Sequence, residues 1–241
     1  MKKLSMFNCK VNKNINYKIT DNNIVIYLSL NLISDEKQFK KIMKSLIKLN
    51  DTLVSNISNE KLILYNITAT DNNIYLDHAN DVIKILSQKN KKSQYELVYD
   101  IVCDKLDNEF VEKNYCDFKD NKCIAQRENK AIHSTMGCCY SFKNTFFGYT
   151  KSKLCKFLNQ TKCETKCMAC KIFTCKYLNE KGIKIKASDN ILLSCFFNKK
   201  QLRILSCNFF IEKDIIISKL LKKSNMPYIL YYFLNKECIT Y

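Results

Sequence analysis

The sequence predicts an α+β protein, with a small N-terminal hairpin, strand and helix region followed by a cysteine-rich, loop-plus-helix domain. Two observations support this prediction. Within the first 57 residues, apolar side chains change from alternating spacing to helical spacing. Further along, nine of the 14 cysteines fall between Cys116 and Cys175. We expect the N-terminal α+β region to cover residues 1–90 and the cysteine-cluster domain, with its C-terminal helices, to cover 93–241.

The N-terminal region begins with strand signals. Residues 14–33 predict a β-hairpin, because apolar and polar residues alternate on both sides of the turn sequence Asp-Asn-Asn at 21–23. Ser34 stands at the N-cap position of a lysine-coated amphipathic helix predicted over 35–57. Residues 61–67 predict a third strand.

The next part of the chain has helical spacing. Apolar residues predict a short helix over 76–86, and the polar run at 88–92 predicts a linker. The sequence Ser-Gln-Tyr-Glu at 93–96 has the form of a capping box, in which Ser93 opens a helix that extends to Phe110.

The cysteine-rich part lacks a regular pattern at first. From Cys116 to about Thr150 the sequence predicts irregular structure. Beyond the cysteines, Ser188 is expected to cap a helix that carries residues 191–196. Helical spacing then predicts two further helices, over 199–207 and 213–222.

Length and composition restrict the compartment. With 241 residues, of which 46% are apolar, the chain can bury a core without disulfides. The N-terminus has no apolar run of signal-peptide length, and the longest run near the C-terminus, residues 228–234, is too short to span a bilayer. We therefore expect a cytoplasmic protein without a membrane partner. Thiols stay free in that reducing compartment, so clustered cysteines predict metal binding or redox chemistry.

The formal net charge of +17 suggests nucleic acid as a partner, since basic excess is typical of phosphate binding. Arg127 and Arg203 are the only arginines, however, and base and phosphate contacts usually recruit arginine. Nucleic acid is thus possible as a partner but not favoured, and the alternative is a surface of solvated lysines. No other partner is identifiable.

The clustered cysteines predict a metal centre. Thiolates bind zinc and iron-sulfur clusters, usually four to each, so the nine cysteines, with or without His133, can supply one site or two. The expected cofactor is an iron-sulfur cluster, preferably of the 4Fe-4S type, or zinc. The expected ligands, of which the last three are second choices, are Cys138, Cys139, Cys155, Cys163, Cys167, Cys170, Cys116, Cys123 and Cys175.

Cys167 and Cys170 have a spacing that suits one metal site. A single turn can aim both sulfurs at one metal while amide N–H groups stabilise their charge. Ten lysines and two acids between residues 151 and 186 give a local charge of +8, which would lower thiol pKa values. The alternative is structural, because Cys163, Cys167 and Cys170 also have the spacing of one buried stripe on a helix.

The spacing Cys163-x3-Cys167-x2-Cys170 is similar to the cluster-binding triad of radical SAM enzymes. This resemblance implies an alternative function, a radical-SAM-like iron-sulfur enzyme that uses these three cysteines. The chain differs from that family in three ways. Ala169 stands where an aromatic residue is usual, only 71 residues follow Cys170, and no glycine-rich SAM-binding motif is present.

A wider set of residues resembles the YkgJ-like cysteine-cluster family, which is described as zinc- or iron-chelating. These residues are Met136-Gly137-Cys138-Cys139, Leu154-Cys155-Lys156-Phe157-Leu158, Cys163, and Cys170-Lys171-Ile172-Phe173 followed by Cys175. They are similar to that family's G-x-C-C, C-x-F-L, C-x-(I/V)-Y and C-(R/K)-x-F blocks, in the same order. The resemblance covers about residues 136–175 and implies a bound zinc or iron-sulfur centre with no assigned reaction.

The sequence therefore predicts a metal-binding protein whose reaction is unknown and whose status as an enzyme is open. A basic, zinc-stabilised nucleic-acid-binding module is a further alternative. No catalytic residue is assigned, because the sequence shows no Ser-His-Asp set, phosphate-binding glycine loop or paired catalytic carboxylates. His78 has no cysteine near it in the sequence, and we expect it to be structural.

Overall fold

The structure is a computed structural model. It describes residues 12–56, 61–120, 122–128, 140–145, 148–154, 158–159, 162–163 and 166–222. The chain divides into two compact units, which we call the N-terminal unit (Met1–Gln94 with Ser194–Phe196) and the C-terminal unit (Tyr95–Leu193 with Phe197–Tyr241). The mixed α+β class is confirmed.

A three-stranded sheet forms one layer of the N-terminal unit. Its strands are β1 (Ile15–Ile19), β2 (Asn23–Ser29) and β3 (Leu62–Thr68), in the order β1-β2-β3. The first two strands form the predicted antiparallel hairpin, with Ile15 opposite Leu28, whereas β3 runs parallel to β2. The predicted hairpin extends too far along the chain, to residue 33, because β2 ends at Ser29 and the side chain of Leu32 is 71% exposed.

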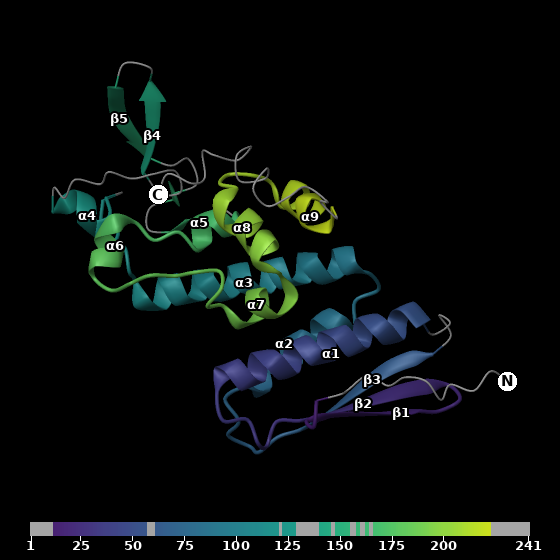
Figure 1. The fold of residues 1–241 in the computed structure, drawn as a ribbon. Helices are drawn as coiled ribbons and strands as arrows, with labels where there is room; N and C mark the ends of the chain where they lie inside the picture. Colours follow the sequence, from purple (N-terminus) through teal and green to yellow (C-terminus); the bar gives the residue numbers. More distant parts are fainter. Residues whose placement is uncertain are drawn as a thin grey trace. The chain divides into compact units, whose positions relative to one another are not determined.

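Two helices, α1 (Glu36–Asn56) and α2 (Leu76–Leu86), cover one face of this sheet (Figure 1). Both confirm the predicted helices. The core between the layers consists of fully buried residues from β2 and α1, namely Ile24, Ile26, Leu28, Phe39, Ile42, Met43 and Leu46. The predicted cap is wrong by one residue, because the N–H of Gln38 donates to Asp35 Oδ1 at 2.7 Å and Asp35, not Ser34, precedes the helix.

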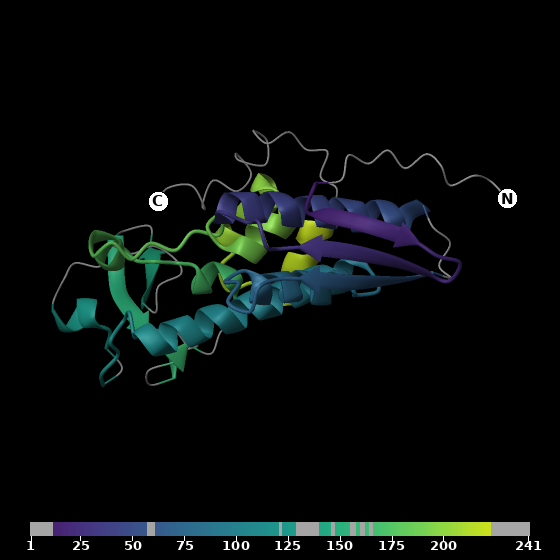
Figure 2. The ribbon, with the colours of Figure 1, turned by 90° about the horizontal axis from the view of Figure 1, so that it is seen from below.

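The longest helix of the described chain is α3 (Lys91–Lys113), which is continuous in Figures 1 and 2. It begins two residues before the expected capping box and includes the end of the expected linker. Asn90 is its cap, since Asn90 Oδ1 accepts the N–H of Ser93 at 2.9 Å. One face of α3 is apolar, with Tyr95, Val98, Tyr99, Val102 and Leu106 buried and Phe110 half-buried.

The rest of the C-terminal unit consists of short elements. The described helices after α3 are α4 (Ile124–Arg127), α5 (Met168–Lys171), α6 (Lys176–Glu180), α7 (Ile191–Phe196), α8 (Lys199–Cys207) and α9 (Lys213–Leu221), and the second half of α7, Ser194–Phe196, belongs to the N-terminal unit. The last three confirm the predicted helices, although Asn190 rather than Ser188 caps α7, with the N–H of Leu193 at 3.0 Å from Asn190 Oδ1. None of the helices formed by the described residues is long and apolar enough to cross a membrane.

Two short antiparallel strand pairs lie in the cysteine-rich stretch. They are β4 (Tyr140–Thr145) with β5 (Gly148–Leu154), and β6 (Leu158–Asn159) with β7 (Lys162–Cys163). The expectation of irregular structure up to about Thr150 is therefore wrong for the first pair. Tyr, Phe and Thr recur in these strands. Their preference for extended backbone favours strands over irregular structure in this part of the chain.

Candidate functional site

Helix α3 positions the segment that contains Cys167 and Cys170. The N–H of Met168 donates to the hydroxyl oxygen of Tyr99 at 2.7 Å, and both groups are buried. One turn further along α3, the thiol of Cys103 donates to the carbonyl of Lys166 at 3.7 Å. These contacts fix the backbone on both sides of Cys167, so the orientation of its side chain is set by the fold.

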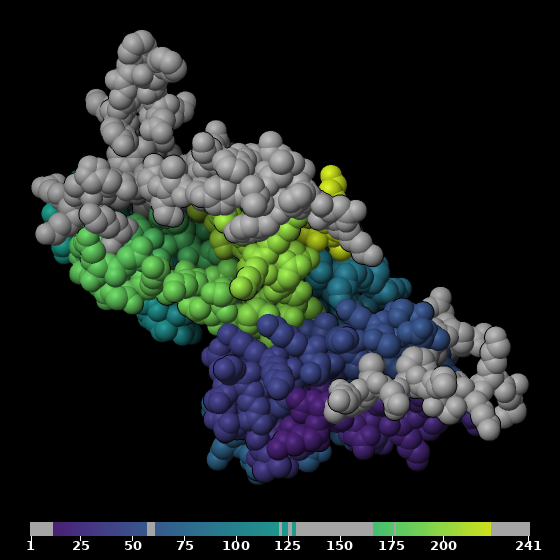
Figure 3. All heavy atoms as spheres, viewed as in Figure 1, coloured from purple at the N-terminus to yellow at the C-terminus, as the bar shows by residue number. Residues whose placement is uncertain are grey.

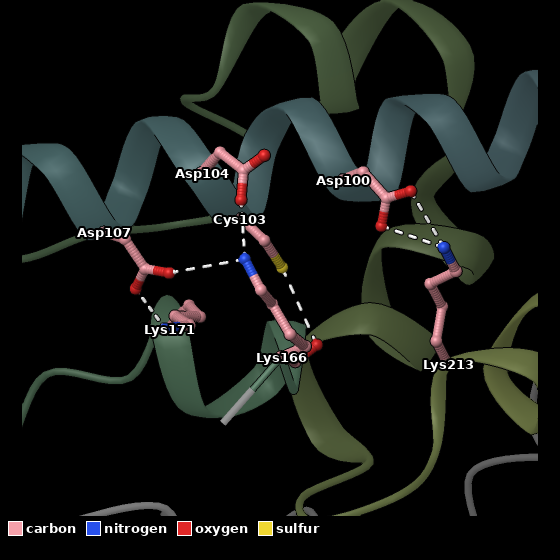
Figure 4. Close-up of polar contacts among 7 residues, drawn as sticks. All are labelled: Asp100, Cys103, Asp104, Asp107, Lys166, Lys171 and Lys213. Carbon is pink, nitrogen blue, oxygen red and sulfur yellow. Dashed lines mark hydrogen bonds and ion pairs between the residues drawn. The ribbon is translucent and has the colours of Figure 1, made fainter. Parts of the chain in front are cut away.

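Four ion pairs connect α3 to the segments that follow it (Figure 4), and the longest of them joins Lys166 to Asp107 at 3.9 Å. Asp100, Asp104 and Asp107 lie along one side of α3 and bind Lys213, Lys166 and Lys171 respectively. The Lys171–Asp107 pair is the buried one, with side chains 5% and 21% exposed, whereas both partners of the Lys166–Asp104 pair are 63% exposed. A buried ammonium group depends on its carboxylate, so Lys171 ties α5 to α3 more tightly than an exposed pair would.

Cys167 is the N-cap residue of α5, with φ −82° and ψ 114°. Its sulfur accepts the N–H of Phe210 at 3.2 Å, and its thiol donates to the carbonyl oxygen of Asn208 at 3.5 Å. Phe210 has a φ of +58°, a left-handed conformation that is uncommon for an aromatic residue. In this conformation the consecutive N–H groups of Phe210 and Ile211 both donate to the Cys167 sulfur, an anion-binding arrangement of backbone amides.

Hydrogen bonding favours the thiolate form of Cys167. The thiol of Cys170 donates to the Cys167 sulfur, as do the backbone N–H groups of Cys170, Phe210 and Ile211, and together they lower the pKa of Cys167 to about 6 against the opposing effect of burial. The sequence suggested lysine charge as the cause, but the leading cause is the Cys170 thiol. The ionisation of Cys167 is therefore linked to Cys170.

A second group of thiols surrounds a small apolar cluster in the same unit. Cys123, Tyr177 and Leu178 are buried there, and Cys116 and Cys175 pack against them. The loop between Cys116 and Cys123 is closed by a bond from the N–H of Ile124 to the Cys116 carbonyl at 2.9 Å, and Cys175 is the N-cap residue of α6. The structure thus gathers the three second-choice ligands, but as members of an apolar cluster.

No three His, Cys, Asp or Glu side chains among the described residues are grouped closely enough to hold one metal ion. The predicted ligands Cys138, Cys139 and Cys155, with His133, lie outside the described residues. Cys163 is described by its backbone, which belongs to β7. This strand overturns the structural alternative of one helical stripe, because Cys163 is in a strand and Cys167 has extended backbone, so that of the three only Cys170 is helical.

Three cysteines outside the cluster differ in their burial. Cys103 and Cys195 are buried, whereas Cys207 is partly exposed. Burial raises the pKa of Cys103 to about 12 and that of Cys195 to about 11. These thiols stay protonated at neutral pH and contrast with Cys167. In the N-terminal unit, His78 packs against the ring of Phe39 with ring centres 6.3 Å apart, which agrees with a structural role.

The raised pKa of Cys103 predicts a loss of stability at alkaline pH. Between the unfolded value of 9.0 and about 12, the unfolded chain loses the Cys103 proton while the folded chain keeps it, so the free energy of unfolding falls as pH rises. We expect a contribution on the order of 1 kcal/mol per pH unit in this range. Urea unfolding at pH 8 to 11 measures the slope, which Cys103→Ala should reduce. An unchanged slope in that variant would contradict this assignment.

Sequence reasoning missed the groups that stabilise the Cys167 thiolate. The amides of Phe210 and Ile211 lie more than 40 residues from Cys167, and backbone N–H groups leave no signal in a sequence. From the sequence, Asp107 and Tyr99 can be recognised only as residues of the predicted helix. The spacing of Asp100, Asp104 and Asp107 could have indicated an acidic stripe facing the lysine-rich segment that follows.

No family model, curated protein or solved structure matches this chain.

Proposed function

We propose that this chain is a metal-binding protein in which Cys167 and Cys170 supply two thiolate ligands to a zinc ion or an iron-sulfur cluster. One observation carries the proposal: the Cys167 sulfur accepts the N–H of Phe210 at 3.2 Å, and hydrogen bonding from Cys170 also favours its thiolate form. Metal-bound thiolates need this kind of stabilisation, because hydrogen bonds to sulfur offset the negative charge of the cage. A cysteine kept only for packing would need none of them.

The remaining ligands come from the rest of the cysteine cluster. Zinc and iron-sulfur clusters usually take four protein ligands, so the pair accounts for half of a site. We assign the other half to Cys138, Cys139, Cys155 or Cys163, in keeping with the resemblance to the YkgJ-like family over residues 136–175. The cluster around Tyr177 holds the second-choice ligands Cys116, Cys123 and Cys175.

Metal analysis of protein purified without air tests the proposal. We expect stoichiometric zinc, or iron with sulfide and visible charge-transfer absorption. The variants Cys167→Ala and Cys170→Ala should each lower the metal content several-fold, whereas Cys195→Ala, which removes a buried thiol of the other unit, should not. Far-ultraviolet circular dichroism identifies variants that fail to fold. A metal-free wild type in which Cys167 and Cys170 form a disulfide would overturn the proposal.

The radical-SAM-like alternative makes a different prediction for the same material. Its cluster would be held by Cys163, Cys167 and Cys170 and would keep one iron open to SAM. Added SAM should then change the absorption or electron paramagnetic resonance spectrum of the reduced cluster. A spectrum that stays the same, or stoichiometric zinc in place of iron, excludes this alternative and leaves the metal-binding proposal intact.

A further inference from the structure

A groove with a volume of about 680 Å³ lies in the C-terminal unit. Its walls come from α5, from α8 and from the segment between α6 and α7. The atoms of these segments have green to yellow-green colours in Figure 3. A volume of several hundred Å³ is typical of sites for small molecules or for one unit of a polymer.

The groove is strongly basic. Lys184, Lys186, Lys199 and Arg203 line it, and none of the described residues that line it is acidic. Lys199 and Arg203 are four residues apart on α8, where like charges repel each other. Within the described part of the chain, Lys184, Lys186 and Lys199 form no ion pair with a carboxylate. A bound anion would relieve this repulsion, and it would contact one of the two arginines of the chain.

One wall of the groove is apolar and contains an aromatic ring. Ile172, Phe173 and Leu202 contribute this wall. The ring of Phe173 is held in place by an edge-on contact with Phe209, with ring centres 5.9 Å apart and an interplanar angle of 83°. A ring that its neighbour holds in place can act as a platform for a flat ligand. Every nucleic-acid base has a flat face that can stack on an aromatic side chain.

Side-chain hydrogen bonds hold two parts of the rim of the groove. At one end, Thr174 and Asn179 form two reciprocal hydrogen bonds, of 2.8 and 3.2 Å, across the first turn of α6. At the other end, Asn198 and Gln201 form a complete capping box at the start of α8, next to Lys199. These bonds hold the start of α6 and the start of α8, whereas Lys184 and Lys186 come from the segment between α6 and α7.

We infer that this groove binds a nucleoside phosphate, with the phosphate among Lys184, Lys186, Lys199 and Arg203 and the base against Phe173. The combination of an anion site and an aromatic platform fits this ligand class better than an inorganic anion or a purely apolar ligand. The nucleotide is either free or a unit of a single-stranded nucleic acid. The inference does not depend on bound metal and goes beyond the proposed metal-binding function.

Fluorescence anisotropy of the full-length chain tests the inference with two labelled probes, ATP and a 12-nucleotide single-stranded DNA. The variant Lys199→Gln/Arg203→Gln should weaken binding at least tenfold, because it removes two phosphate contacts. The control Lys41→Gln/Lys48→Gln removes the same charge from exposed positions of α1 and should change affinity less than twofold. Phe173→Leu, which keeps an apolar side chain, should weaken binding roughly fivefold or more.

The outcomes separate the sources of the nucleotide. Binding of ATP that is lost in the groove variant supports a free nucleotide, and binding of the oligonucleotide alone, lost in the same variant, supports single-stranded nucleic acid. Equal weakening by the control, full competition by pyrophosphate, or binding of neither probe would overturn the inference. The metal content of Lys199→Gln/Arg203→Gln should match the wild type, so a failure here stays distinguishable from a failure of the metal-binding proposal.

Discussion

Replacement of Asp107 by alanine is expected to lower the free energy of unfolding by about 3–5 kcal/mol. The variant leaves the ammonium group of Lys171 without this carboxylate, and the Lys171 side chain is only 5% exposed. The buried ammonium group of Lys171 then loses the carboxylate that offsets much of its desolvation cost, which explains why this change is more damaging than removing the whole pair. Urea denaturation of the full-length chain at neutral pH measures the effect.

The same helix provides matched controls. Asp104→Ala and Asp100→Ala remove the same side chain from α3, but the Lys166–Asp104 pair is 63% exposed on both sides and the Lys213–Asp100 pair is 31% and 48% exposed. Exposed pairs contribute at most about 1 kcal/mol, so both variants should stay within that limit. If all three variants lose the same free energy of unfolding, the effect comes from changing a residue of helix α3 and not from the burial of the charge.

A double variant separates charge from packing at this position. Asp107→Leu/Lys171→Met replaces the pair with apolar side chains of similar length, and such replacements are often neutral or stabilising. We expect it to recover most of the stability lost in Asp107→Ala. If it is as unstable as the single variant, the pair matters for its geometry rather than for its charge.

The elements that could be predicted are those with local periodicity. The hairpin, α1, α2, α8 and α9 follow from apolar spacing, because each buries one face against its neighbours. The caps could not be located in the same way. In α1, α3 and α7 a serine was expected, but Asp35, Asn90 and Asn190 accept the N–H three residues on. Ser, Asp and Asn are all good caps, so the choice depends on where the helix can begin against the core.

The candidate site could be predicted only in part. The spacing of Cys167 and Cys170 indicated two cooperating sulfurs, and a hydrogen bond between them is present. The contacts that give Cys167 its chemistry, from Tyr99 through Met168 and from Phe210, join residues that are 69 and 43 positions apart. Contacts over such separations depend on the packing of α3, α5 and α8, which no local pattern encodes. The groove around Phe173 was missed for the same reason.

In the metal-bound protein proposed above, removal of the metal is expected to destabilise the C-terminal unit by on the order of 10 kcal/mol. The helices next to the thiols have little stability of their own, since α5 has 4 residues and α6 has 5, and isolated helices below about 12 residues are marginal in water. The N-terminal unit has its own layer of α1 and α2 on a three-stranded sheet. It should therefore keep its structure.

Hydrogen exchange measured by mass spectrometry, before and after chelation, resolves the two units. Peptides from α5, α6 and α8 should lose protection, while those from β2 and α1 should keep it. Added zinc or reconstituted cluster should restore protection in the wild type but not in Cys167→Ala, where the sulfur that collects four hydrogen bonds is missing. If chelation removes the metal and α5 stays protected, the metal does not stabilise the C-terminal unit. The contacts of α5 with α3 would then be enough to keep α5 folded.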